Sequence, residues 1–197
     1  MGLAHHKVFL SHSRADTGVA KLLRHCLELM GGTTFLDVVD LPAGVTMRSK
    51  LIAEIRNSQE MLLLISPKFL ESRWLDWELG VAEAISLPVV PILFGMTTTE
   101  LTSHPKLRDY FLERYCIELG DIEAYLDQLQ MRISEFATKQ ANTAGRGVVA
   151  SRTRDGEEDV DGVTIEMYLE DARLELKESL ERYEAARQLR NRKRNQG

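Results

Sequence analysis

Blocks of hydrophobic residues alternate with polar segments from residue 7 to about residue 137. Four short apolar runs, KVFLSHS, TTFLD, MLLLIS and LPVVPILF, end in polar or turn-forming residues and predict buried strands. Between these runs, apolar residues recur at three- and four-residue spacing, which predicts helices over residues 16–30, after Gly44 and before LPVVPILF. YCIEL predicts a fifth strand, and residues 122–136 predict a closing helix.

This alternation of strand and helix predicts an α/β fold. The expected architecture is a doubly wound, flavodoxin-like parallel sheet of five strands with helices on both faces, plus a C-terminal helix. MLLLIS is hydrophobic on both faces and is therefore expected at the centre of the sheet. Pro91 cannot donate a hydrogen bond, which moves LPVVPILF toward an edge. Such folds bind ligands at the carboxyl ends of their strands.

The last third of the chain has a different composition. Residues 138–164 are rich in Gly, Ser, Thr, Arg and Asp without periodicity, which predicts a flexible linker. Residues 165–197 predict an amphipathic helix that ends in the basic stretch RQLRNRKR. Its apolar stripe fits either a coiled coil or packing on the chain's own domain. The basic end fits a solvated helix terminus or a contact with nucleic acid or another acidic partner.

Composition restricts the function classes. A chain of 197 residues with 44% hydrophobic residues can bury a core without disulfides, and Cys26 and Cys116 lack metal-ligand spacing, so we expect reduced thiols and a cytoplasmic protein. The net charge of −5 argues against general nucleic-acid binding. No stretch fits a signal peptide or a membrane span. No GxGxxG motif follows a predicted strand, and the phosphate-loop, zinc-protease and serine-hydrolase motifs are not found in the sequence.

One carboxylate stands out in the stretch SRWLDWELG, residues 72–80. At about 100° per residue, Glu78 lies roughly 200° from Asp76 around a helix and is expected to share an apolar face with Trp74, Val81 and Ile85. The polar stripe of the same helix comprises Arg73, Asp76, Gly80 and Glu83. A carboxylate among apolar residues either pairs with a cation or belongs to a functional site, and the pattern alone leaves both readings open.

Four ordered segments resemble the conserved boxes of the Toll/interleukin-1 receptor homology (TIR) domain. They are KVFLSHSRAD, TFLDVVDLPAG, LIAEIRNSQEMLLLISPKFLESRWLDWEL and VVPILF. FLDVVDLPAG resembles the mobile loop of that family, and Trp74 with Glu78 matches the W-x-x-x-E pattern of its enzymatically active members. The resemblance implies a TIR domain over residues 1–137.

The resemblance also implies the site. In the active members the glutamate is the catalytic residue that breaks NAD at the nicotinamide bond, whereas members that act only as signalling adaptors commonly lack it. The implied catalytic residue is Glu78, and the implied substrate-binding residues are Trp74, Ser11, His12, Asp37 and Gly44. NAD⁺ is the expected substrate, and no cofactor or metal is expected. His12 is also a candidate from its position at the carboxyl end of a strand.

The expected function is therefore an NAD⁺ hydrolase that yields nicotinamide and ADP-ribose or a cyclic ADP-ribose isomer. By resemblance it would act in immune or anti-phage defence and be activated by assembly with other TIR copies, as a homo-oligomer or filament. A separately encoded sensor or effector is a further expected partner, and a membrane is not. The competing hypothesis is a non-catalytic scaffold that works through TIR–TIR contacts and is sensitive to changes at Pro42 or Gly44 rather than at Glu78.

Overall fold

A computed structural model describes most of the chain. The described residues are 5–36, 47–72, 75–104, 107–111, 114–118, 121–145, 167–179, 181–182, 185 and 192. Their elements are β1 (Lys7–His12), η1 (Arg14–Asp16), α1 (Thr17–Leu29), β2 (Thr33–Leu36), α2 (Met47–Arg56), β3 (Glu60–Ile65), η2 (Phe69–Glu71), α3 (Leu75–Ala84), β4 (Val89–Leu93), α4 (Thr98–Thr102), α5 (Arg108–Phe111) and α6 (Ile122–Gly145).

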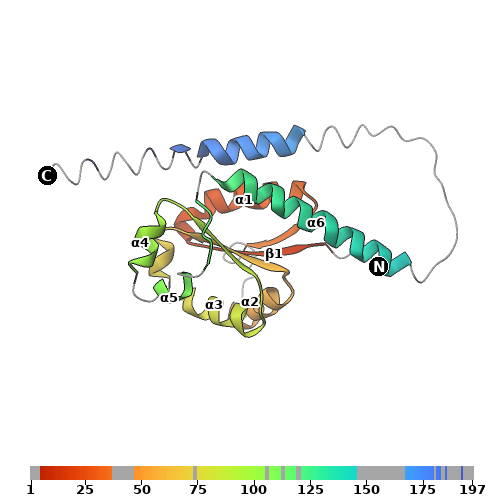
Figure 1. Ribbon diagram of the computed structural model, residues 1–197, viewed down its shortest axis with the longest axis horizontal. Coiled ribbons are helices and arrows are strands. Elements are labelled where there is room, and N and C mark those ends of the chain that lie inside the picture. The colour runs from red at the N-terminus through yellow and green to blue at the C-terminus, as the bar shows by residue number, and fades with distance from the viewer. Residues whose placement is uncertain are drawn as a thin grey trace.

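A parallel sheet with the strand order β2-β1-β3-β4 forms the centre of the fold (Figure 1). Every residue of β3 is buried, which agrees with the central position expected for MLLLIS. Helices α1 and α6 cover one face of the sheet, and α2 and α3 lie on the other (Figure 1). The predicted α/β fold with a parallel sheet and helices on both faces is confirmed.

The sheet has four strands, and the fifth strand expected at YCIEL is not found among the described residues of that segment. Among the described residues 114–118, only Ile117 forms a bridge, with Ile92 of β4. Ile117 donates to the Pro91 carbonyl over 2.9 Å and accepts from the Leu93 amide over 2.8 Å. The next bond of a parallel ladder on this edge would need the amide hydrogen of residue 91, which proline lacks. Pro91 therefore explains why the described residues before Ile117 do not extend this bridge into a strand.

Alternation along the strands separates two hydrophobic cores. Val8 and Leu10 of β1 pack with α1 and α6, while Phe9 between them packs with α2 and α3.

Two consecutive positions in the turn between α1 and β2 favour glycine. Gly31 has a φ of +85°, and a Cβ on Gly32 would lie 3.1 Å from the Leu27 carbonyl oxygen.

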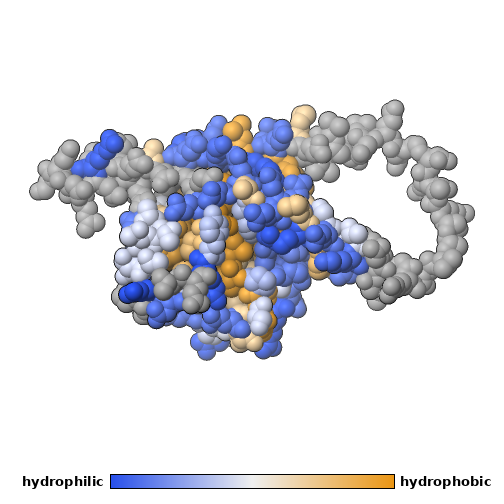
Figure 2. Space-filling view, viewed as in Figure 1, coloured by the Kyte–Doolittle hydropathy of each residue, from blue (hydrophilic) through white to orange (hydrophobic). Residues whose placement is uncertain are grey.

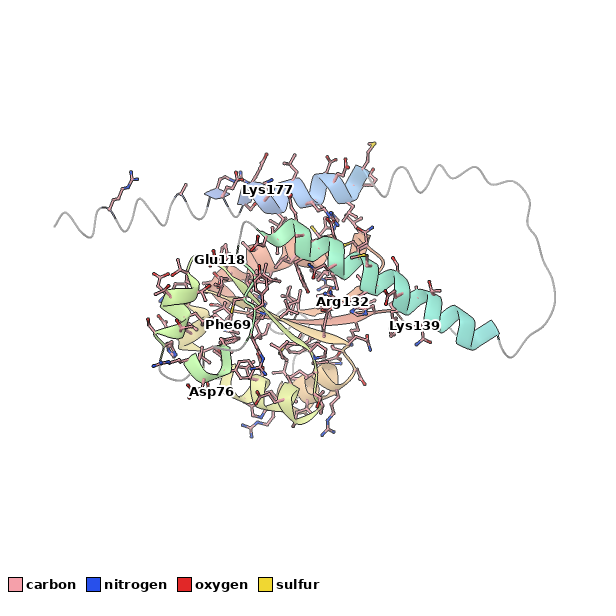
Figure 3. All side chains as sticks on the ribbon, in the orientation of Figure 1. Phe69, Asp76, Glu118, Arg132, Lys139 and Lys177 are labelled. Atoms are coloured by element: carbon pink, nitrogen blue, oxygen red, sulfur yellow. The ribbon has the colours of Figure 1, made fainter. Side chains whose placement is uncertain are left out.

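The C-terminal helix, described over residues 167–179, packs on the same domain (Figure 1). Leu169, Ala172 and Leu176 are buried in the core shared by α1 and α6. At the rim, Arg173 contacts Asp127 of α6 over 2.6 Å, and Lys177 points toward α6 and contacts Glu123 over 3.0 Å (Figure 3). Of the two arrangements that the stripe allowed, these residues show intramolecular packing.

Helix α6 is longer than the sequence pattern predicts. It continues to Gly145, beyond the expected domain boundary at residue 137 and into the segment expected to be a linker. Most of the basic stretch RQLRNRKR lies outside the described residues, so the two readings of that stretch stay open. Within the described part of the chain, no helix is both long enough and apolar enough to cross a lipid bilayer.

Candidate functional site

Two of the predicted site residues meet at the carboxyl edge of the sheet. The Ser11 hydroxyl, near the end of β1, donates a hydrogen bond of 2.5 Å to Oε2 of Glu78 on α3. Both residues are only 1% exposed. The fold thus brings together residues separated by 67 positions in the sequence, at the edge where open α/β sheets bind ligands.

The packing of α3 explains why a carboxylate is held inside. Leu75, Leu79 and Ala82 are buried on the same side of the helix as Glu78. The apolar face expected for Glu78 is therefore present, but its members differ from the prediction, because Val81 is half-buried and Ile85 is 37% exposed. The predicted polar side is exposed where it is described, at Asp76, Gly80 and Glu83.

Burial of a charged carboxylate is costly unless hydrogen bonds and nearby positive potential compensate it. Glu78 has both forms of compensation, because Ser11 donates to it and because it lies in the first turn of α3, at the positive end of the helix dipole. Away from water, such a carboxylate interacts strongly with any positive charge that develops nearby. The arrangement suits the stabilisation of a cationic transition state.

His12, the last residue of β1, is also buried at this edge and is 4% exposed. Its Nε2 lies 3.2 Å from the Thr17 hydroxyl at the start of α1. Burial lowers the pKa of His12, and a backbone hydrogen bond at Leu10 opposes this shift. The imidazole is therefore held in its neutral form at neutral pH, in which one ring nitrogen donates and the other accepts.

The structure adds a second buried pair that the sequence reasoning missed. Ser66, which directly follows β3, donates to the Asp16 carboxylate over 2.5 Å and accepts from the Phe69 amide over 3.1 Å. Burial raises the pKa of Asp16, while the bond from Ser66 lowers it. In the sequence, Asp16 belongs to SHSRAD and Ser66 to MLLLIS, and both segments are expected at the carboxyl ends of strands. This shared expected position is the sequence feature that could have placed both residues near the site.

Three other predicted site residues, Trp74, Asp37 and Gly44, lie outside the described residues. Their predicted roles therefore stay predictions. Among the residues that the structure does describe, no group of three or more histidine, cysteine, aspartate or glutamate side chains is arranged to hold a metal ion.

The low pKa of His12 predicts a pH effect on stability. Because the unfolded chain takes up a proton near pH 6.5 and the folded chain does so only at lower pH, the free energy of unfolding should fall as the pH falls below 6.5. The slope from this one group is at most about 1.4 kcal/mol per pH unit. Urea unfolding of the wild type and His12→Gln between pH 5 and 8 measures it.

A His25→Gln variant is the control, because it removes an exposed histidine from α1. The His12 variant should show the weaker pH dependence of the two. Equal dependence of the unfolding free energy on pH for the wild type and both variants would contradict a lowered pKa of His12.

Comparison with known proteins defines the family. No curated protein sequence matches the chain. The TIR domain of the Toll-related receptor TRR-2 from Hydra magnipapillata is similar in structure, with a TM-score of 0.51 and 19% identity over 68% of this chain and 98% of that domain. A TIR-STING receptor from C. gigas, solved in complex with 2′,3′-cGAMP, has a TM-score of 0.51 and 26% identity, over 66% of this chain and 40% of the receptor. Residues 8–130 match the family described as TIR domain, and the chain therefore belongs to the TIR domain family.

Proposed function

We propose that the protein is an NAD⁺ hydrolase in which Glu78 is the catalytic residue. The observation that supports this proposal is a carboxylate that is 1% exposed, hydrogen-bonded by Ser11 and located at the ligand-binding edge of an α/β sheet. The position of Glu78 in a W-x-x-x-E sequence agrees with the pattern of the active TIR enzymes.

The proposed reaction needs few groups. The bond between the ribose C1′ and the nicotinamide N1 breaks, and its electron pair leaves with nicotinamide, which is cationic in NAD⁺ and departs neutral. No general acid is required, unlike in ordinary glycoside hydrolysis. Positive charge develops on the ribose, and Glu78 stabilises that charge and accepts hydrogen bonds from the ribose hydroxyls. Water then attacks C1′ and loses a proton, which gives ADP-ribose; attack by an adenine or ribose atom gives a cyclic isomer.

Ser11 has a positioning role in this proposal. Its hydroxyl donates a hydrogen bond to Oε2 of Glu78 and so holds the carboxylate in one orientation beside the end of β1. Trp74 would cover a ring of the substrate and exclude water. His12, Asp37 and Gly44 would complete the substrate pocket.

Access to the carboxylate requires movement, because Glu78 is almost fully covered in this conformation. We propose that contact between copies of the chain, as a homo-oligomer, stabilises an open form that admits NAD⁺. Activity per molecule should then rise with protein concentration or crowding.

Incubation of the purified chain with NAD⁺, followed by chromatography and mass analysis of the products, tests the function. Nicotinamide should appear together with ADP-ribose or a cyclic isomer, at a rate per molecule that increases under crowding. No nicotinamide release at any protein concentration would reject the enzymatic proposal. Self-association in that case would favour the non-catalytic scaffold.

Substitution of Ser11 by alanine should lower the rate of nicotinamide release, although Glu78 itself is unchanged. A charge-assisted hydrogen bond is worth about 1.5–3 kcal/mol, so Ser11→Ala should reduce kcat by roughly ten- to a hundredfold. Ser58→Ala is the matched control, because Ser58 is a buried serine just before β3 that donates to the Glu54 carbonyl over 2.8 Å. Steady-state kinetics should show a reduced kcat for the Ser11 variant and little change for the Ser58 variant. Equal rates would remove Ser11 from the proposed site.

A further inference from the structure

A cavity of about 500 Å³ lies at the opposite edge of the sheet from Glu78. It is bounded by the first residues of β3 and β4, including Glu60 and Val89, and by Tyr125 and Arg132 on α6. Figure 2 shows hydrophobic surface gathered beside the hydrophilic side chains of α6 on this side of the molecule. The volume lies in the range of small-molecule sites in proteins.

The cavity occurs where the fifth strand was expected. Pro91 removes the donor that pairing before Ile117 would need, and Tyr115 lines the cavity as a residue that is 78% exposed. Val89, Val90 and Ile117 contribute an apolar wall. The recess is thus a consequence of the sheet architecture.

A buried polar group lies in the cavity lining. Glu60 is 3% exposed, accepts a hydrogen bond of 2.8 Å from Nε2 of His6 and pairs with Arg132 over 3.1 Å. Figure 3 shows Arg132 on the sheet-facing side of α6. Well-packed apolar residues often stabilise a fold as well as buried ionic groups do, so stability alone does not explain this cluster.

Planar polar side chains line the same cavity as Glu60. The Arg132 guanidinium lies 5.5 Å from the centre of the Tyr125 ring, which is buried, and the guanidinium is a planar group on which an aromatic ring can stack. Burial and the charge of Glu60 raise the pKa of Tyr125 well above its usual value, so its hydroxyl keeps its proton. The amide side chains of Gln59 and Gln128 also line the cavity. The Gln59 oxygen already accepts a hydrogen bond of 2.6 Å from the Lys7 amide, which fixes this side chain and leaves its NH₂ group to donate, while the Gln128 amide can donate and accept in one plane.

From this combination of groups we propose that the cavity binds a small, uncharged, planar nitrogen heterocycle of nucleobase to nucleoside size. Val90 and Ile117 would contact one side of the ring, and the amides of Gln59 and Gln128 would bond its edge. The site is separate from the Glu78 site, because β3 begins at one and ends at the other.

Charge favours an uncharged ligand. The positive charge of Arg132 is already paired with Glu60, so an anion would have to compete for it. The other acid of the lining, Asp121, accepts a hydrogen bond of 3.1 Å from Tyr115 and would repel an anion further. A cation would be repelled by the charge of Arg132, and Asp121 at the exposed rim already accepts the hydrogen bond from Tyr115.

Adenosine is a suitable probe, and calorimetric titration of the full-length protein measures its binding. Ala124→Trp should weaken binding at least about tenfold, because Ala124 is an exposed α6 residue in the cavity lining and tryptophan would fill the space. Ser134→Trp places the same side chain at an exposed α6 position outside this lining and should leave affinity unchanged within about twofold. Adenosine monophosphate should bind no more tightly than adenosine.

Amide chemical shifts locate the ligand independently of NAD⁺ turnover. Adenosine should shift the resonances of Glu60, Val89 and Val90 more than those of Ser11 and Ser66. Absence of saturable binding, equal binding by the Ala124→Trp variant, or shifts confined to the Ser11 and Ser66 edge would each overturn the proposal. Markedly tighter binding of the monophosphate would overturn the uncharged ligand class.

Discussion

Substitution of Glu78 by glutamine is expected to lower nicotinamide release from NAD⁺ by about 10²- to 10³-fold or more. Glutamine has nearly the same shape and keeps an oxygen that can accept the hydrogen bond from Ser11, so the packing of α3 should persist. The negative charge that would stabilise the developing ribose cation is lost. Kinetics at saturating NAD⁺ should therefore show the loss mainly in kcat.

Asp76→Asn is the matched control for this change. It removes the same charge from the first turn of the same helix, but Asp76 is exposed. This control variant should retain nearly full activity, and circular dichroism should show that both variants are folded. A Glu78→Gln enzyme as active as the wild type would exclude Glu78 as the catalytic residue, even if nicotinamide release itself were observed.

Leu176→Ala is expected to lower the free energy of unfolding by about 2–5 kcal/mol. Leu176 is fully buried between the C-terminal helix and the core of α1 and α6, so truncation removes apolar contacts and leaves a cavity. Urea denaturation followed by circular dichroism measures the change.

Leu174→Ala is an equivalent substitution on the same helix at a residue that is 56% exposed, and it should change stability by less than about 0.5 kcal/mol. Equal effects of the two variants would contradict the observed packing of this helix. If the apolar stripe instead formed a coiled coil between copies, the loss would depend on protein concentration. The expected loss is independent of concentration.

Much of the sheet is predictable because its signals are local. MLLLI, residues 61–65, is hydrophobic at every position, and such a run has few stable locations other than the middle of a parallel sheet. The burial of Glu78 could likewise be inferred from its angle on a helix. Its exact neighbours could not, because α3 ends at Ala84, so that Ile85 lies in the following turn and is 37% exposed.

The missed features depend on contacts that are distant in the sequence. Ser66 and Asp16 are separated by 50 positions, and nothing local indicates that they pair. YCIEL has the composition of a strand, yet its pairing before Ile117 lacks the donor that Pro91, on a different segment, cannot supply. Helix α4 has a local signal that was overlooked, since Thr97 and Glu100 form a capping box.

Pro91 also affects how the molecule meets its neighbours. An open row of amide and carbonyl groups along the last strand of a sheet is a template on which a strand of another molecule can add, and such addition leads to aggregation. On β4 the proline removes one donor from that row, and Ile117 occupies the next two groups, the Pro91 carbonyl and the Leu93 amide. Growth of the sheet from molecule to molecule is thereby disfavoured at this border, so strand addition between copies would have to use the other edge of the sheet, at β2.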